Sequence, residues 1–141
     1  AGISFVSSDI EALPFPDSTF DLITMSFATR NINLDRETLI RRFGEYRRVL
    51  KPGGRFVNLE TSRPPLALIR TVMDLYIRLF VKITGTALSG TKAGYAYLAH
   101  SIPRFYPADE LAAILREAGF SQVTYRQFMF GAAAIHESYK Y

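Results

Sequence analysis

The 141-residue chain contains no cysteine, so it can form neither a disulfide framework nor a thiolate metal site. It also lacks a long uninterrupted apolar run. The most apolar stretch, residues 75–83, contains Arg78 and Lys82 and is too short to span a bilayer. We therefore expect a cytoplasmic protein, with peripheral contact at a membrane surface left open.

A dense basic cluster is lacking as well. Lys and Arg number 17 against 13 Asp and Glu, a formal net charge of +4, but the basic residues are spread along the sequence. This distribution favours anionic cofactors or membrane surfaces as partners over nucleic acid. The two histidines, His100 and His136, stand too far apart for a metal-binding spacing, so no metal is expected. The length suits one domain over residues 1–141, and a hydrophobic content of 48% is enough for a core.

The first part of the chain predicts two strands and a helix. Strands are expected over residues 3–6 and 20–27. The near-continuous apolar character of the second predicts burial on both faces, as in a parallel sheet. Asp35 is a candidate helix N-cap. Apolar residues then recur at helical spacing: Leu39, Phe43, Tyr46 and Leu50.

The segment from Arg48 to Ser62 carries the strongest local signal. Pro52 cannot continue the helix, and Gly53-Gly54 supply a tight reversal before a buried strand. The strand ends in polar residues, Glu60 to Ser62. In open α/β sheets ligands bind at the carboxyl ends of strands, so these residues mark a candidate site. The alternative is an ordinary turn with solvated polar residues.

The second part predicts two helices and a hairpin. A long amphipathic helix is expected over residues 66–83. Its apolar face would consist of Ile69, Val72, Met73, Tyr76, Leu79, Phe80 and Ile83. A second helix should open at Pro107 and end at Gly119. Strands over residues 123–129 and 132–139, joined at Gly131, predict an antiparallel hairpin on one edge of the sheet.

The string from Arg48 to Gly54, followed by Glu60-Thr61-Ser62, resembles the third conserved motif of class I S-adenosylmethionine-dependent methyltransferases. The longer pattern is similar to the quinone-biosynthesis C-methyltransferases, the UbiE/COQ5/MenG family, and the similarity covers the whole chain. The resemblance implies an α/β, Rossmann-like sheet with strand order 3-2-1-4-5-7-6 and strand 7 antiparallel. This chain would supply strands 3 to 7.

The glycine-rich loop of such enzymes has no counterpart here, because none of the 9 glycines forms Gly-x-Gly-x-Gly. We therefore expect residues 1–141 to be the C-terminal part of a single methyltransferase domain, with its first two strands missing. Strand 20–27 would then be an exposed edge, open to pairing with a second copy as a homodimer or with residues 3–6. S-adenosylmethionine binding by this chain alone should be weak or absent.

The resemblance also assigns cofactor-binding residues. Asp9 and Ile10 correspond to the adenine-binding loop, where a carboxylate accepts from the adenine amino group and the next backbone N–H faces a ring nitrogen. Ser26 corresponds to a position that contacts the cofactor. The alternatives are a solvated turn residue for Asp9 and an ordinary strand serine for Ser26.

Arg30 and Tyr97 are the catalytic candidates that the resemblance implies. Arg30 would lie beside the substrate, and Tyr97 would shape the quinol pocket under the helix 66–83. The alternatives are a helix-cap and salt-bridge role for Arg30, packing for Tyr97, and a plain core or interface role for the helix. The implied reaction is methyl transfer to a ring carbon of a polyprenyl quinol, either demethylmenaquinol or 2-methoxy-6-polyprenylbenzoquinol. A sterol or phenol acceptor, or a non-catalytic dimerising module, is the alternative function.

Overall fold

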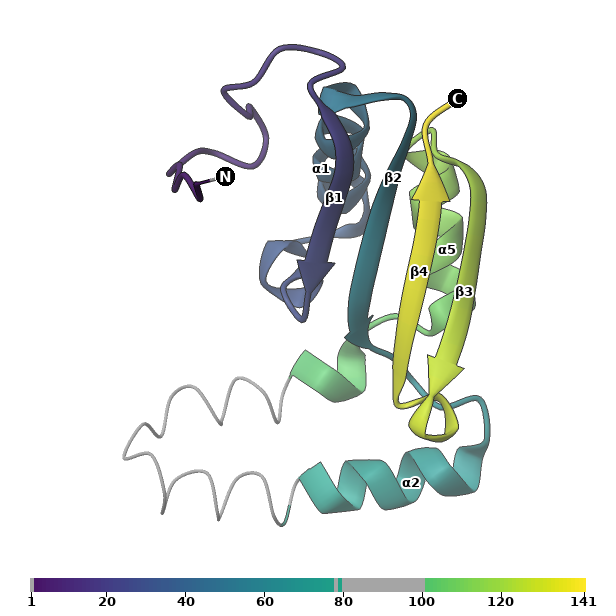
Figure 1. Cartoon of the computed structure of the whole chain (residues 1–141). Coiled ribbons are helices and arrows are strands. Elements are labelled where there is room, and N and C mark those ends of the chain that lie inside the picture. Colours follow the sequence, from purple (N-terminus) through teal and green to yellow (C-terminus); the bar gives the residue numbers. More distant parts are fainter. Residues whose placement is uncertain (1, 78, 80–100) are drawn as a thin grey trace.

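The computed structural model describes residues 2–77, 79 and 101–141, which build one four-stranded sheet (Figure 1). The strands are β1 (Phe20–Ser26), β2 (Leu50–Thr61), β3 (Ser121–Phe128) and β4 (Ala133–Tyr139). Their order is β1-β2-β4-β3, with β1 parallel to β2 and the other two pairings antiparallel. This arrangement confirms the predicted edge hairpin and matches the expected block of strands 4-5-7-6.

Two helices cover one face of the sheet, α1 (Arg36–Val49) and α5 (Ala108–Glu117) (Figure 1). Asp35 caps α1 as predicted, because its side chain accepts a hydrogen bond from the Thr38 backbone N–H at 2.8 Å. That bond lowers the pKa of Asp35. The core under the helices consists of Leu39, Phe43, Tyr46, Leu50, Phe56, Phe105, Leu111, Ala112, Ile114, Leu115, Phe120 and Val123.

The predicted limits of α5 are confirmed. Pro107 occupies the N-cap, where its missing N–H costs no helical hydrogen bond. Gly119 follows the last turn with φ +93°, a left-handed conformation that glycine adopts without penalty. Its N–H donates to the Arg116 carbonyl at 2.9 Å. This tight reversal sends the chain directly into β3.

The expected turn at Pro52-Gly53-Gly54 is instead an irregularity inside β2. Helix α1 ends at Val49 and the strand begins at Leu50, so the Pro-Gly-Gly segment belongs to the strand. Gly53 has φ +76° and donates its N–H to the Lys140 carbonyl at 2.6 Å; Gly54 accepts from the Lys140 N–H at 3.0 Å. Backbone bonds with Lys140, directly after β4, therefore keep this segment in the sheet, and the register with β1 shifts here.

Helix α2 (Ala67–Tyr76) lies beyond the end of the sheet, below the hairpin tip in Figure 1. It confirms the start of the predicted long helix, whose far end falls outside the described residues. On the predicted apolar face, Val72, Tyr76 and Leu79 are exposed. The described residues also form three short 3-10 helices: η1 (Thr29–Ile32), η3 (Ile102–Arg104) and η4 (Met129–Gly131).

The predicted strand over residues 3–6 is wrong. These residues have no regular secondary structure, and Phe5 is 95% exposed. Strand β1 therefore stays at the edge of the sheet among the described residues, and its expected burial on both faces is also wrong. Ile23 and Met25 pack against the core, whereas Leu22 on the other face is 47% exposed. The physical reason is that both described helices that cover the sheet lie on one face.

Three glycines allow a sharp test of the β2 irregularity. A Cβ on Gly54 would lie 2.7 Å from the Lys51 carbonyl oxygen, whereas a Cβ on Gly53 would meet nothing within 4 Å but would be strained by its positive φ. We expect Gly53→Ala to lower the free energy of unfolding by about 1 kcal/mol, and Gly54→Ala to lower it by more. Gly44→Ala in α1 is the control, because its Cβ is unhindered, and it should stabilise by roughly 0.5–1 kcal/mol. Urea unfolding gives all three values; equal losses for Gly53 and Gly54 would contradict the close approach.

Candidate functional site

Polar side chains meet at the carboxyl ends of the parallel pair β1 and β2. The Arg30 Nε donates to the Glu60 Oε1 at 3.1 Å, and both side chains are buried, Glu60 completely. The Arg30 Nη1 also lies 3.4 Å from the Ser101 hydroxyl. Glu60 accepts two further hydrogen bonds at Oε1, from the Thr61 backbone N–H and the Thr61 hydroxyl. The guanidinium is therefore held in a fixed position by two segments that are distant from it in the sequence.

Arg30 thus forms the salt bridge that the sequence analysis gave as the alternative to a place beside the substrate. Its contact with a substrate stays a prediction, and Tyr97 lies outside the described residues. Sequence reasoning noted Glu60 only as one of three polar residues after a strand and missed its partner. The signal that could have revealed the pair is a carboxylate at the carboxyl end of the central strand β2, because a buried acid there needs a buried cation as its partner.

A second polar layer continues under the helices. The Thr29 hydroxyl donates to the Asn58 Oδ1 at 2.9 Å, and Asn58 pairs across the sheet with His136. The His136 Nε2 lies 2.8 Å from the Ala108 carbonyl, and burial lowers the pKa of His136, which favours the neutral ring. Among the described residues, Asn58 Nδ2, Ser62 Oγ and His136 Nδ1 are buried without a hydrogen-bond partner. Ordered water is the usual partner of such atoms.

No metal site accompanies this layer. Over the described parts of the chain, no group of three or more His, Cys, Asp or Glu side chains could hold a metal ion. Likewise, none of the described helices is long and apolar enough to cross a membrane.

Asp9 lies in an exposed loop that precedes β1. Its Oδ1 accepts the Glu11 backbone N–H at 2.9 Å, and Glu11 is itself bound by Arg42 of α1. The neighbouring Ile10 packs partly against the core, so the loop is anchored at that point. Ser26 is exposed at the end of β1, and no hydrogen bond among the described residues joins it to Asp9. The structure thus fixes the loop, and the shared cofactor-binding role of Asp9 and Ser26 stays a prediction.

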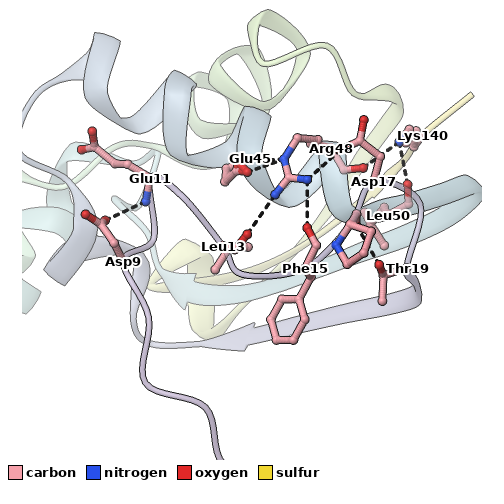
Figure 2. A network of polar contacts seen from close by, with 11 residues as sticks. Asp9, Glu11, Leu13, Phe15, Asp17, Thr19, Glu45, Arg48, Leu50 and Lys140 are labelled. Carbon is pink, nitrogen blue, oxygen red and sulfur yellow. Dashed lines mark hydrogen bonds and ion pairs between the residues drawn. The ribbon is translucent and has the colours of Figure 1, made fainter.

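Arg48 clamps the rest of this loop onto α1 (Figure 2). Its Nη1 donates to the Phe15 carbonyl at 2.9 Å and to Asp17 at 2.7 Å, and its Nη2 donates to the Leu13 carbonyl at 3.1 Å. Its Nε donates to Glu45 one turn earlier in the helix. Hydrogen bonds with Asp17 and Glu45 raise the pKa of Arg48. Sequence reasoning treated Arg48 only as a member of a motif and missed this contact.

The described residues fit the adenine end of S-adenosylmethionine. Asp9 is exposed, and the hydrogen bond it accepts from Glu11 occupies one of its two carboxylate oxygens, so the other can accept from an exocyclic amine. Adenine presents such a donor beside a ring acceptor. The methionine end is different, because the 9 glycines of the sequence supply no glycine-rich loop.

The Arg30–Glu60 pair provides a stability test of this site. We expect Glu60→Gln to lower the free energy of unfolding by about 3–5 kcal/mol, because a buried guanidinium loses its carboxylate. Asp21→Asn is the control: it removes an acid from the exposed Lys51–Asp21 pair and should cost less than about 1 kcal/mol. Urea unfolding measures both. A Glu60→Gln loss as small as that of the control would show that the pair does not hold the two strand ends together.

Comparison with known proteins gives a consistent result. Residues 1–140 match the model of the ubiE/COQ5 methyltransferase family. The chain is 41% identical over 139 residues to the mitochondrial 2-methoxy-6-polyprenyl-1,4-benzoquinol methylase of Dictyostelium discoideum, covering 98% of this chain and 43% of that protein. It is 42% identical to the ubiquinone/menaquinone biosynthesis C-methyltransferase UbiE of Pseudomonas fluorescens (strain SBW25), covering 98% of this chain and 52% of that protein. The chain thus spans about half the length of these relatives.

Solved structures agree on the fold. A SAM-dependent methyltransferase from Thermotoga maritima, described as a possible histamine N-methyltransferase, superposes with a TM-score of 0.67 at 19% identity, covering 99% of this chain and 65% of that one. A SAM-dependent methyltransferase from Aquifex aeolicus gives 0.56 at 18% identity, covering 96% and 53%. At such identities the likeness concerns the fold, and it is an α/β methyltransferase-like fold.

Proposed function

The chain belongs to the ubiE/COQ5 methyltransferase family, and from this membership we propose that it is the C-terminal part of a C-methyltransferase that acts on a polyprenyl quinol. The observation that carries the proposal is the similarity of nearly the whole chain, about 40% identical, to relatives named for this chemistry. The acceptor would be 2-methoxy-6-polyprenyl-1,4-benzoquinol or demethylmenaquinol. The cofactor would be S-adenosylmethionine.

The described sheet supports the view that further strands complete this domain. The outer edge of β1 has no strand beside it among the described residues, and both helices that cover the sheet lie on one face (Figure 1). The opposite face presents Leu22, Val57 and Leu59, which are only partly covered. A doubly wound sheet carries helices on both faces. We therefore propose that two strands and their helices, including the glycine-rich loop, pack against β1.

Arg30 is the residue proposed to face the acceptor ring. S-adenosylmethionine supplies an electrophilic methyl group when bound, so the acceptor carbon needs electron density from an ionised ring hydroxyl. A guanidinium stays charged at neutral pH and is a poor base, but it stabilises a phenolate that develops beside it. Glu60 would fix the direction of that charge, and Arg48 would fix the loop that carries Asp9. Proton removal would fall to water or to a group outside the described residues.

A methylation assay tests this proposal. We expect the complete protein to transfer a labelled methyl group from S-adenosylmethionine to one of the two quinols, and not to a sterol or a simple phenol. Residues 1–141 alone should show weak or no cofactor binding by calorimetry, because the methionine end of the cradle is missing. Methylation of a sterol or phenol alone would assign a different acceptor. Micromolar cofactor binding by residues 1–141 would refute the proposal that this chain holds only part of the cofactor site.

The exposed edge of β1 supports the second candidate, a dimerising module. Unpaired edge groups are ready to pair with another strand, and we propose that residues 1–141 alone dimerise through β1. We expect Thr24→Lys, on the exposed side of β1, to give a monomer in sedimentation equilibrium. Thr124→Lys, at an exposed position on the opposite edge strand β3, is the control and should leave the dimer intact. A monomeric unmodified chain, or equal effects of the two variants, would exclude pairing through β1.

A further inference from the structure

Two inward-facing side chains of β2 hold two consecutive residues of η1. Glu60 accepts hydrogen bonds from the Arg30 backbone N–H at 3.4 Å and from the Arg30 Nε at 3.1 Å. Asn58, two residues earlier on the same face of the strand, accepts from the Thr29 hydroxyl at 2.9 Å. Thr29, Asn58 and Glu60 are completely buried. The segment that carries Arg30 is therefore tied to β2 twice, once by an ion pair and once by a neutral hydrogen bond.

The neutral support continues from Asn58 to His136 on β4. The two residues are directly opposite each other in the antiparallel pairing of β2 and β4, and both are buried. Side chains in such a pair have Cβ atoms about 4.5–5.5 Å apart. On its other side, the His136 Nε2 lies 2.8 Å from the carbonyl oxygen of Ala108, the first residue of α5. Burial lowers the pKa of His136 and so favours a neutral ring. Because a carbonyl oxygen only accepts, the ring proton is on Nε2, and Nδ1 is an acceptor.

The remaining polar atoms of this cross-strand pair are complementary. Within the described residues, Asn58 Nδ2 and His136 Nδ1 are buried without a hydrogen-bond partner. The amide nitrogen is a donor and the ring nitrogen is an acceptor. One buried water between them can accept from the first and donate to the second, which is how buried polar groups are commonly satisfied. Such a water completes a chain of hydrogen bonds from the Ala108 carbonyl through His136 and Asn58 to Thr29.

We propose that His136 is a positioning residue for Arg30. It fixes the Asn58 amide through one bridging water, and Asn58 fixes Thr29, which directly precedes Arg30 in η1. Glu60 sets the direction of the guanidinium, whereas this second support sets the position of the backbone that carries it. The position matters because a misplacement of about 1 Å at a reacting group costs on the order of a hundredfold in rate. The benefit to catalysis rests on the proposed function, whereas the chain of hydrogen bonds does not.

Methyl-transfer kinetics of the complete protein test the positioning role. Thr29→Val removes the hydroxyl and keeps a branched side chain of similar shape. His136→Gln keeps a donor near the place of Nε2 and removes the acceptor at Nδ1. We expect each variant to lower kcat and kcat/KM together, by roughly tenfold to a hundredfold, with the KM for the quinol unchanged, because alignment is lost only in the transition state. His136→Asn should recover part of the rate lost in His136→Gln, since its Oδ1 takes the place of the Nδ1 acceptor.

Ser138→Ala is the matched control. Ser138 lies on the same face of β4, two residues after His136, and its buried hydroxyl likewise has no partner among the described residues. It is opposite Phe56 rather than Asn58, so it has no place in the chain of hydrogen bonds that leads to η1. The variant removes a polar atom from the same core, and we expect kcat and KM to stay unchanged.

Nuclear magnetic resonance tests the chain of hydrogen bonds without turnover. In protein with nitrogen-labelled histidine, the ring signals that disappear in His136→Gln should be those of a neutral ring protonated on Nε2. The same substitution should shift the backbone amide signal of Arg30, whereas Ser138→Ala should leave that signal in place. Both results would be expected only if His136 supports the segment that carries Arg30.

Three results would overturn the proposal. One is a ring protonated on Nδ1, because that atom could then not accept from the water. Another is an Arg30 amide signal that does not respond to His136→Gln. The third is a loss of kcat in Ser138→Ala as large as in His136→Gln, which would show a general loosening of the core. If the complete protein methylates neither quinol, the proposed function fails, and the amide signal of Arg30 alone decides whether His136 supports η1.

Discussion

The structure depends on β2, which pairs with a strand on each edge and is covered by helices on one face. Its backbone bonds to β1 on one side and to β4 on the other. Phe56 in its middle is fully buried and contacts aromatic rings of α1 and Phe120, which follows α5. Two parallel strands must be joined by a crossover connection. Between β1 and β2 this connection contains α1, which packs over β2. The same helix that seals the core therefore also sets the position of the strand ends where Glu60 meets Arg30.

The elements that sequence predicted well are those whose signals are local. Asp35 and Gly119 mark helix ends through their own side-chain or backbone chemistry, and the spacing from Leu39 to Tyr46 is that of a helix on a core. Family resemblance added the strand order, which no local pattern contains. Both kinds of information agree on the central block of the sheet, and that block is where the core residues lie.

The predictions that were wrong depended on neighbours. Residues 3–6 have strand-like composition, but a strand exists only when an adjacent strand supplies hydrogen bonds. The Pro52–Gly54 segment reads as a turn, yet pairing with Lys140 keeps it in the strand. At the site, resemblance singled out Arg30, whose role toward a substrate stays a prediction, whereas its partner Glu60 required a contact across 30 residues of sequence.

Burial explains why the Arg30–Glu60 pair is compatible with a functional role as well as a structural one. A buried ion pair is costly to desolvate and gives modest stability compared with apolar packing of the same volume. Its benefit is a charge of fixed direction, because each carboxylate bond to Thr61 and to the guanidinium restricts rotation. A chain selected only for stability would gain by replacing the pair with apolar side chains at the ends of β1 and β2. That these strand ends instead hold a fixed guanidinium, beside the edge where α/β sheets bind their ligands, is the physical argument for the proposal that Arg30 faces the acceptor.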